Sequence, residues 1–320
     1  ENHVATAFRA GGHTVIPLQE DDPATWAHLL DPGWVADTDP DLVLWTRTWH
    51  LPDFDQLGAL AALADAGVPT VGYHLDRWWG LPREHQVADE PYFRCDLMVT
   101  ADGGHDEQWA EAGVNHLWLP PGVLGVECHD LPAQRATGRT PVGFVGSWQH
   151  YHPEWPSRRE LVNHLRRHYR PRFRARPPHP PVSVRGAALA AVYSRVDVVA
   201  GDSCLTGGAT RYWSDRIPET LGRGGFLIHP EVEGLSEHFT PGEHLVTVPA
   251  ADWDAMRDAI DYWLERPLER RQIASAGREH VLAHHTYERR TEQLLEAVET
   301  MRAGKGGHHV ARRGRMRAVF

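Results

Sequence analysis

The sequence predicts an α/β protein built from two doubly wound domains. Short apolar runs alternate with amphipathic helical patterns in both halves of the chain. Residues 124–140 lose this periodicity, and the alternation then restarts. Strands separated by helices of about 10–15 residues form βαβ units, which give parallel sheets with right-handed crossovers. We therefore expect two parallel sheets, one before and one after residues 124–140.

The first domain is predicted to cover residues 1–130. It opens on a helical pattern, residues 1–12, that ends at two glycines, and further helical patterns cover 54–67 and 105–113. The strand patterns are apolar and bounded by polar or turn residues; they are 13–17, 41–45, 69–73, 96–100 and 115–123. A doubly wound domain normally opens on a strand with a Gly-rich loop. We therefore expect one strand and its loop upstream of Glu1.

The second domain is predicted to cover residues 131–285. Its strand patterns are 141–148, 196–203, 226–230 and 244–249, and its helical patterns are 154–169, 185–195, 215–223, 253–267 and 268–285. A separate helix is predicted over 286–302. Residues 303–320 are rich in Gly, Arg and His, which predicts a mobile basic tail.

The composition is globular and narrows the possible functions. Hydrophobic residues make up 41% of the 320 residues, and no apolar run approaches the roughly 18 residues of a membrane span. No charged-then-apolar leader is present. Three widely spaced cysteines predict neither a disulfide framework nor a zinc site, so we expect a reducing cytoplasm. The net charge of −10 argues against non-specific nucleic-acid binding.

The basic residues are almost entirely arginine, because Lys305 is the only lysine among 33 basic residues. Such a bias usually follows a GC-rich genome, and we expect a bacterial or phage source. A phosphate group must therefore be held by arginine, histidine or backbone N–H groups. A catalytic lysine is effectively excluded.

Residues 211–235 contain the strongest candidate for a ligand site. A short helical segment carries Arg216 and Glu219 on one face, and Gly224 and Gly225 separate it from an apolar strand. One interpretation is a surface ion pair of a few tenths of a kcal/mol. The other is that both groups hold a polar ligand at the carboxyl end of a parallel sheet, with the glycines letting the backbone approach that ligand.

Three other segments of the second domain carry candidate ligand-binding residues. Gly146 and Ser147 follow the first strand of this domain and lead towards a helix, whose N-terminus favours a diphosphate. Asp202 and Ser203 lie at another strand end, at the lip of the Gly-rich loop 201–215, which is long and polar enough to contact a substrate. Arg185 opens a helix and is a candidate phosphate cation. An ordinary tight turn and a solvated arginine are the alternative interpretations.

In the first domain, His74 and Asp76 follow the strand 69–73. A substrate hydroxyl that reacts as a nucleophile needs a base with a pKa near 7. A histidine oriented by a carboxylate suits that role. With 22 histidines in the chain, a structural role is the alternative. Trp78 and Trp79 are able to stack on a sugar or to pack in the core.

Two further patterns favour simpler interpretations. The histidines at 284–285 and in 152–155 do not have the spacing of a metal site, and we expect no bound metal. The arginine-rich run 158–180 is interpreted mainly as a solvated helix face, with a nucleic-acid patch as the alternative.

The segment from Pro141 to about Arg290 resembles the C-terminal half of GT-B glycosyltransferases, specifically the group 1 domain of the spore-maturation-protein type. The similarity lies in residues 143–148, 196–203, 216–230, 233–246 and the helical tail through 290, in family order. The first domain fits the acceptor-binding domain of such enzymes in pattern only.

The resemblance implies two Rossmann-like domains facing a cleft, a nucleotide-diphosphate-sugar donor and no cofactor or metal. Glu219 matches the second of two glutamates in many retaining enzymes, the one that binds the ribose. Arg211 stands where the first glutamate is expected, so the usual sugar contact and the anomeric outcome stay open. Arg216 matches an arginine of the spore-maturation branch and either binds the diphosphate or orients Glu219.

The leading hypothesis is therefore a metal-independent glycosyltransferase. The alternatives are a nucleotide-sugar epimerase or hydrolase of the same fold and a non-enzymatic two-domain binding protein. The acceptor is left open between a small molecule, a protein, a cell-envelope component and modified DNA.

Overall fold

The computed structural model describes residues 2–18, 22, 25, 27–46, 55–128, 139–147, 155–176, 184, 186–206, 208, 210–304 and 315–320. The chain divides into two compact units. Unit 1 contains Glu1–Leu119 and Tyr287–Phe320, and unit 2 contains Pro120–Thr286. The sequence predicted a domain boundary at residue 130, whereas unit 1 leaves off at Leu119. The helix that begins after residue 286 belongs to unit 1.

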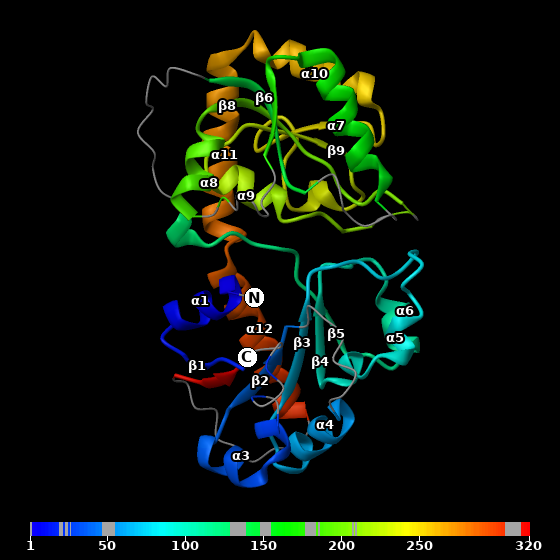
Figure 1. Cartoon of the computed structure of the whole chain (residues 1–320), viewed down its shortest axis with the longest axis vertical. Helices are drawn as coiled ribbons and strands as arrows, with labels where there is room; N and C mark the ends of the chain where they lie inside the picture. Colours follow the sequence, from blue (N-terminus) through cyan, green and yellow to red (C-terminus); the bar gives the residue numbers. More distant parts are fainter. Residues whose placement is uncertain are drawn as a thin grey trace. The chain divides into compact units, whose positions relative to one another are not determined.

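Unit 1 is a parallel sheet of six strands in the order β1-β11-β2-β3-β4-β5 (Figure 1). The strands are β1 (Thr14–Ile16), β2 (Leu42–Trp45), β3 (Thr70–His74), β4 (Leu97–Thr100), β5 (His116–Trp118) and β11 (Arg317–Val319). Both faces of the central strands are buried, so β2 and the first three residues of β4 are continuously apolar instead of alternating. This explains why periodicity predicted them as short continuous runs.

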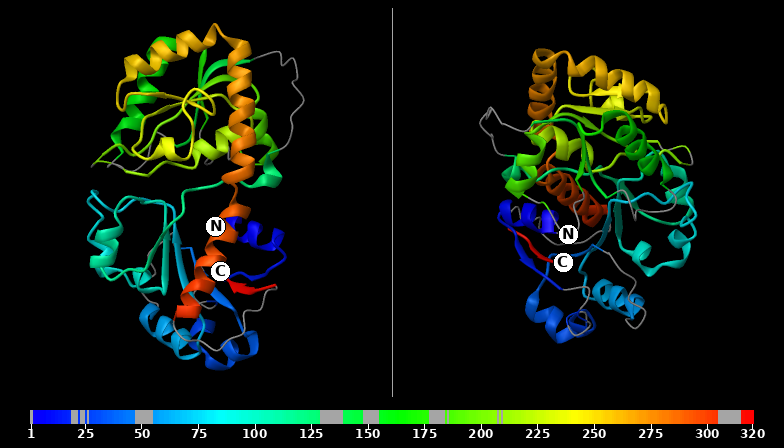
Figure 2. Two further views of the ribbon diagram at one scale, coloured as in Figure 1. Left: turned by 180° about the vertical axis from the view of Figure 1, so that it is seen from behind. Right: turned by 45° about the horizontal axis from the view of Figure 1, so that its top comes forward.

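Helices connect these strands in unit 1. They are α1 (Asn2–Ala10), η1 (Ala27–Leu30), α3 (Pro32–Thr38), α4 (Gln56–Asp65), α5 (Gln86–Asp89), η2 (Pro91–Arg94), α6 (Asp106–Glu111) and α12 (Tyr287–Gly304). Local signals set their ends: Asp31 caps α3 by accepting from Gly33 N–H, and Pro32 occupies the first turn. The helix α1 packs against α12, as the rear view in Figure 2 also shows.

The C-terminal strand β11 corrects the expectation of a mobile tail over 303–320. Its residues pair in parallel with β1 on one side and β2 on the other. Met316, Ala318 and Val319 are buried, because a central slot of the sheet removes these apolar side chains from water. The slot between β1 and β2 is therefore filled by β11. Residues 305–314 lie outside the described residues.

Unit 2 is a parallel sheet of five strands in the order β10-β9-β8-β6-β7. The strands are β6 (Thr140–Val145), β7 (Phe173–Arg176), β8 (Val196–Ala200), β9 (Leu227–Pro230) and β10 (Val246–Val248). The chain moves from β6 to β7 in one direction and then to β8 on the other side. The carboxyl ends of β6 and β8 therefore form a topological switch point, where open α/β sheets bind ligands.

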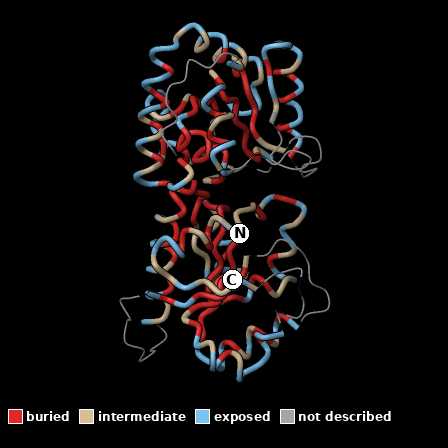
Figure 3. Tube along the Cα trace, turned by 60° about the vertical axis from the view of Figure 1, so that its left-hand side comes forward, coloured by how far each residue is buried: buried red, intermediate tan, exposed pale blue. Residues whose placement is uncertain are grey.

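The helices of unit 2 are η3 (Gly125–Glu127), α7 (Pro156–Tyr169), α8 (Gly186–Tyr193), α9 (Arg216–Gly222), η4 (Leu235–Glu237), α10 (Trp253–Leu264) and α11 (Pro267–His284). In α7, Leu161, Val162 and Leu165 are fully buried and pack against Val142 and Phe144 of β6. Figure 3 shows buried residues following the strands of each unit. Within the described residues, no helix is long and apolar enough to cross a membrane.

Candidate active site

The switch point of unit 2 holds a buried carboxylate between two arginines. Asp202, two residues beyond β8, is fully buried. Its Oδ1 accepts from Arg216 Nη1 at 2.5 Å, and its Oδ2 accepts from Arg158 Nε at 2.9 Å. Arg216 Nε also donates to the carbonyl of Val145 at 2.7 Å, and Arg158 Nη1 donates to the carbonyl of Ser147 at 3.1 Å. The network therefore joins the carboxyl ends of β6 and β8 to α7 and α9.

The charges of this network do not cancel. Burial alone opposes ionisation of Asp202, but the guanidinium groups of Arg216 and Arg158 lower the pKa of its carboxyl below the usual value. Counting these three groups alone, one carboxylate faces two guanidinium groups, which is a local excess of one positive charge. This excess lies beside the Gly146–Ser147 turn and near the N-terminus of the 14-residue helix α7. A buried positive excess at a helix N-terminus favours an anion such as a diphosphate.

Gly146 is required by the same network. Its φ of 146° is disfavoured for other residues, and a Cβ at this position would lie 2.3 Å from Arg216 Nη2. The turn after β6 therefore admits the guanidinium group only because it has no side chain. Ser147 is half-buried and contributes its carbonyl to Arg158.

Asp202 and Ser203 do not lie at the lip of an open loop, as the sequence analysis expected. Both are fully buried, and the Ser203 hydroxyl donates to the carbonyl of Tyr212 at 3.0 Å. Their role in the structure is to organise the strand ends. His229 of β9 contacts this strand end, because its Nε2 lies 3.1 Å from the carbonyl oxygen of Asp202. Burial lowers the pKa of His229 to about 4.

Glu219 of α9 is held by Arg223, which donates to its Oε2. The other amino group of Arg223 donates to Glu127 of η3 at 2.5 Å. The ion pair that the sequence analysis considered between Arg216 and Glu219 is thus replaced by two different pairs, Arg216–Asp202 and Arg223–Glu219. The hypothesis that Arg216 orients Glu219 is wrong in this respect, because Arg223 supplies the contact.

Gly224 and Gly225 end α9 and pack against it. Gly224 has a φ of 73°, and Gly225 N–H donates to the carbonyl of Thr220 at 2.8 Å. A Cβ on Gly225 would lie 2.8 Å from Thr220 Cγ2. The close approach that requires this glycine is to the helix itself.

Two other predicted positions have different outcomes. Arg185 lies outside the described residues. Arg211, which stands where a glutamate was expected, forms an ion pair with Glu237 at 2.7 Å and packs over Gly234.

In unit 1, His74 and Asp76 lie at the carboxyl end of β3 and are each about one-quarter exposed. His74 Nδ1 accepts from the backbone N–H of Asp76 at 3.2 Å and lies 4.0 Å from its carboxylate. Asp76 also forms an ion pair with Arg83 at 3.1 Å. In this geometry the proton of the neutral imidazole resides on Nε2. Transfer of the proton to Nδ1, facing Asp76, would expose Nε2 as a base.

Asp102 fixes the loop that follows His74, and sequence reasoning did not find it. It lies two residues beyond β4 and is fully buried, and its Oδ2 accepts from the backbone N–H groups of Trp78 and Trp79 at 2.8 and 2.9 Å. Burial raises the pKa of its carboxyl, although these two N–H groups act in the opposite direction. Trp78 is buried, and its ring packs edge-on to His74 with centroids 4.7 Å apart.

Sequence signals existed for some of the residues that were missed. Arg223 follows Glu219 by four positions, the spacing of a helical ion pair. Arg158 lies in the first turn of α7, but it was included in a run interpreted as a solvated face. Asp102 offered only its position after a strand.

In the part of the chain that the structure describes, no group of three histidine, cysteine, aspartate or glutamate side chains is arranged to hold a metal ion. The residues 152–154 of one rejected metal pattern lie outside that part.

The family model described as "Glycosyl transferase-like" matches residues 133–296. The chain belongs to this family. It is therefore an enzyme of the glycosyltransferase class, and the alternative of a non-enzymatic binding protein is excluded. No curated protein matches the chain.

Solved structures share the GT-B fold of this glycosyltransferase at low identity. A glycosyltransferase from Rickettsia africae has a TM-score of 0.59 and 11% identity, covering 94% of this chain and 93% of its own. Anabaena HepE in complex with UDP-glucose has a TM-score of 0.60 and 14% identity, covering 93% and 94%. Sucrose-phosphate synthase from Thermosynechococcus elongatus has a TM-score of 0.58 and 14% identity, covering 94% and 92%.

Proposed function

We propose that this glycosyltransferase binds a nucleoside-diphosphate sugar on unit 2 and transfers the sugar to a hydroxyl group held by unit 1. The observation that carries the proposal is the Arg158–Asp202–Arg216 network beneath the Gly146–Ser147 turn. Its positive excess lies at a switch point and at a helix N-terminus, two independent features that favour a diphosphate. HepE binds UDP-glucose, which makes a UDP-sugar the first donor to test.

Glu219 is proposed to bind the ribose. A carboxylate accepts two hydrogen bonds from a vicinal diol, and charged acceptors form the stronger bonds. Arg223 donates to Oε2 of Glu219 and fixes its position, while Glu127 fixes Arg223 from the other side. The position of Arg216 three residues before Glu219 is also the basis for proposing the spore-maturation-protein branch of the family.

His74 is proposed as the group that receives the acceptor proton. The acceptor oxygen forms the new bond to the anomeric carbon, the bond from that carbon to the diphosphate breaks, and the hydroxyl proton passes to His74. Asp76 would stabilise the resulting imidazolium. The departing diphosphate is stabilised by the arginine network and backbone N–H groups. We propose that this chemistry needs no metal and no cofactor, since fixed cationic groups take the place of a metal.

The acceptor belongs to one of four classes, namely a small molecule, a protein, a cell-envelope component or modified DNA. The three cysteines are buried free thiols, which supports the expectation of a reducing cytoplasm in a bacterial or phage setting.

A thermal-shift panel of UDP, GDP, ADP, CDP and dTDP tests the donor site. A ligand at 100 times its dissociation constant adds about 2.7 kcal/mol of stability. We expect one nucleotide to raise the melting temperature of the wild type and to have a smaller effect on Glu219→Gln. The matched control is Glu243→Gln, whose side chain is 63% exposed and should leave the shift unchanged.

If no nucleotide shifts the wild-type midpoint, the proposed donor site is wrong. If the identified nucleotide sugar is consumed without an acceptor and free sugar appears, the hydrolase alternative replaces the transferase.

A further inference from the structure

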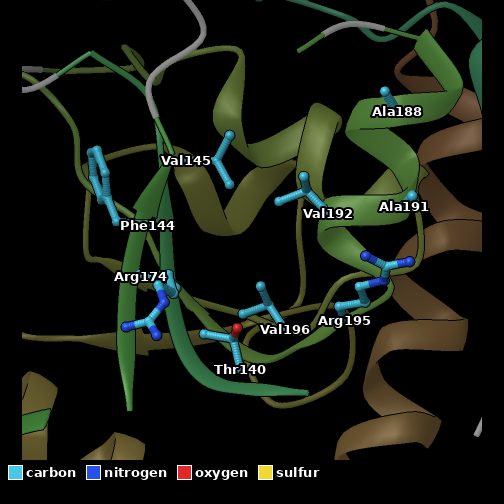
Figure 4. A pocket seen from close by; sticks show the side chains of 10 residues that line it. Thr140, Phe144, Val145, Arg174, Ala188, Ala191, Val192, Arg195 and Val196 are labelled. Carbon is cyan, nitrogen blue, oxygen red and sulfur yellow. The ribbon is translucent and has the colours of Figure 1, made fainter. Parts of the chain in front are cut away.

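Unit 2 also contains a pocket that lies away from the carboxyl strand ends described above. It has a volume of about 140 Å³ and lies between α8 and the face of β6 and β7 (Figure 4). Its lining residues come from β6, β7, α8 and the start of β8; they are Thr140, Gly143, Phe144, Val145, Arg174, Ala188, Ala191, Val192, Arg195 and Val196. A cavity of about 150 Å³ admits a benzene ring.

Small residues from two elements line the pocket. Ala188 and Ala191 of α8 contribute only methyl groups. Gly143 of β6 has no side chain, and Val196 packs against it so closely that a Cβ there would lie 2.8 Å from Val196 Cγ1. Val145 and Val192 face each other across the pocket in Figure 4. The walls between β6 and α8 are therefore mainly apolar.

The end of the pocket near Thr140 is positively charged. Arg174 and Arg195 lie on either side of this end and are exposed. Among the described residues, the hydrogen bonds of the Arg174 side chain use Nη1 alone, which donates to the carbonyls of Pro171 and Phe173.

No lining residue is acidic, and the carboxylate nearest along the chain, that of Asp197, forms ion pairs with other arginines. Asp197 follows Val196 and forms ion pairs with Arg139 at 2.5 Å and Arg270 at 3.3 Å. One carboxylate thus serves two arginines, which leaves Arg174 and Arg195 to an external anion. This local excess contrasts with the net charge of −10.

The pocket is distinct from the proposed donor site. Thr140 and Val196 begin β6 and β8, whereas the donor-site residues follow the carboxyl ends of the same strands. The two places meet at Val145, whose carbonyl accepts from Arg216, and at Phe144, whose ring centroid lies 4.6 Å from Arg216 Cζ.

We propose that this pocket binds a small ring-shaped anion, with the ring between β6 and α8 and a carboxylate or phosphate group on Arg174 and Arg195. Arginine binds both groups through two parallel hydrogen bonds, so the charge chemistry is shared between a carboxylate and a phosphate ester. The apolar walls require a ring without many hydroxyl groups.

Isothermal titration and thermal shift with benzoate, phenyl phosphate and the neutral benzyl alcohol test the proposal. We expect at least one anion to bind with a stoichiometry of one and the alcohol to bind at least tenfold more weakly. Whichever anion binds more tightly identifies the natural group as a carboxylate or a phosphate ester.

Two variants locate the binding. Ala191→Leu fills the pocket from a helical position, and Arg195→Gln removes one charge. Each should weaken anion binding at least tenfold, whereas the exposed control Arg159→Gln should not change it. If Ala191→Leu fails to fold, Arg195→Gln alone decides the location.

Titration with saturating nucleotide, the one identified by the panel above, separates this site from the donor site. Retained anion binding supports two sites, whatever the fate of the proposed function. Loss of anion binding by competition, equal binding of the alcohol, or unchanged binding by Arg195→Gln would each overturn the proposal.

Discussion

Asp102 in unit 1 and Asp202 in unit 2 occupy equivalent positions and have opposite electrostatics. Each lies two residues beyond a parallel strand, β4 or β8, and each is fully buried. Asp202 is bound by two guanidinium groups, and its pKa is lowered. Asp102 accepts hydrogen bonds from two backbone N–H groups, while Arg77 and His105 lie 3.8 and 3.9 Å away, and burial raises its pKa.

The difference shows that the βα architecture determines the depth of a residue, while its neighbours determine its charge state. The surroundings follow the same division. In unit 1, aromatic rings gather around the strand ends, with Trp78 against Phe93 and Trp79 against Trp109. In unit 2, guanidinium groups gather there. One architecture thus places aromatic side chains at the strand ends of unit 1 and guanidinium groups at those of unit 2.

Removal of β11 tests the stability of the unit 1 sheet and should lower the free energy of unfolding more than any other change considered below. Deleting residues 316–320 removes the buried side chains of Met316 and Val319, leaves β1 without a partner strand and leaves β2 paired on one side only, with β3. Burial of the two side chains alone is worth about 5 kcal/mol. Hydrogen exchange should increase in β2 and β3 and stay unchanged in β6 and β8. The exposed Arg317→Gln is the control.

Asp202→Asn tests the unit 2 side and should cost about 3–5 kcal/mol of unfolding free energy, because two buried arginines lose their counter-charge. Urea denaturation measures the loss. The control is Asp258→Asn, which removes an exposed pair with Arg257 and should cost less than about 1 kcal/mol. Equal costs for the two variants would show that the network is solvated.

His74→Gln separates catalysis from donor binding. If His74 receives the acceptor proton, kcat should fall by about 10²–10⁴-fold, while the nucleotide-induced thermal shift of unit 2 stays at the wild-type value. Steady-state kinetics and the nucleotide panel provide the two readouts. A variant with wild-type kcat would remove His74 from the mechanism.

Acid pH should weaken both units through buried neutral histidines. Burial lowers the pKa of His229 in unit 2 to about 4 and that of His116 in unit 1 to about 3. Unfolded histidine binds a proton near pH 6.5, so the contribution of His229 is complete above pH 6.5 and is lost as pH falls to about 4. The loss is on the order of 3 kcal/mol.

His229→Gln should flatten this decline in unit 2 and leave that of unit 1 unchanged. Hydrogen exchange between pH 7 and pH 4.5, resolved by strand, measures both. An unchanged slope in β8 and β9 would show that His229 is protonated in the folded state.

Gly146→Ala should have the smallest effect on stability, about 1–3 kcal/mol, because the new methyl group displaces Arg216 Nη2 from a position 2.3 Å away. Its effect on nucleotide binding should be larger than its effect on folding. The control Gly67→Ala has a similarly unfavourable φ, 71°, but open space around the Cβ. If both variants bind nucleotide like the wild type, the turn after β6 takes no part in donor binding.

Sequence reasoning could predict the alternation of strands and helices because buried parallel strands are continuous apolar runs. It could not predict β11, because three residues, Arg-Ala-Val, in a Gly- and Arg-rich tail give no periodic signal. Arg223 lies four positions after Glu219 and gave a signal that was not used, whereas the pairing of Arg216 with Asp202 depends on how α9 and the end of β8 meet in space. A one-dimensional pattern does not contain that distance.

The position of β11 also bears on how the chain is made. Met316 N–H donates to His13 across 303 positions of sequence. On a ribosome, every strand of unit 2 is synthesised before β11, so unit 2 is able to fold while the unit 1 sheet still has an open slot between β1 and β2. During that interval the edges of β1 and β2 are exposed to other chains. The nascent protein therefore depends on β11, made after all of unit 2, to protect β1.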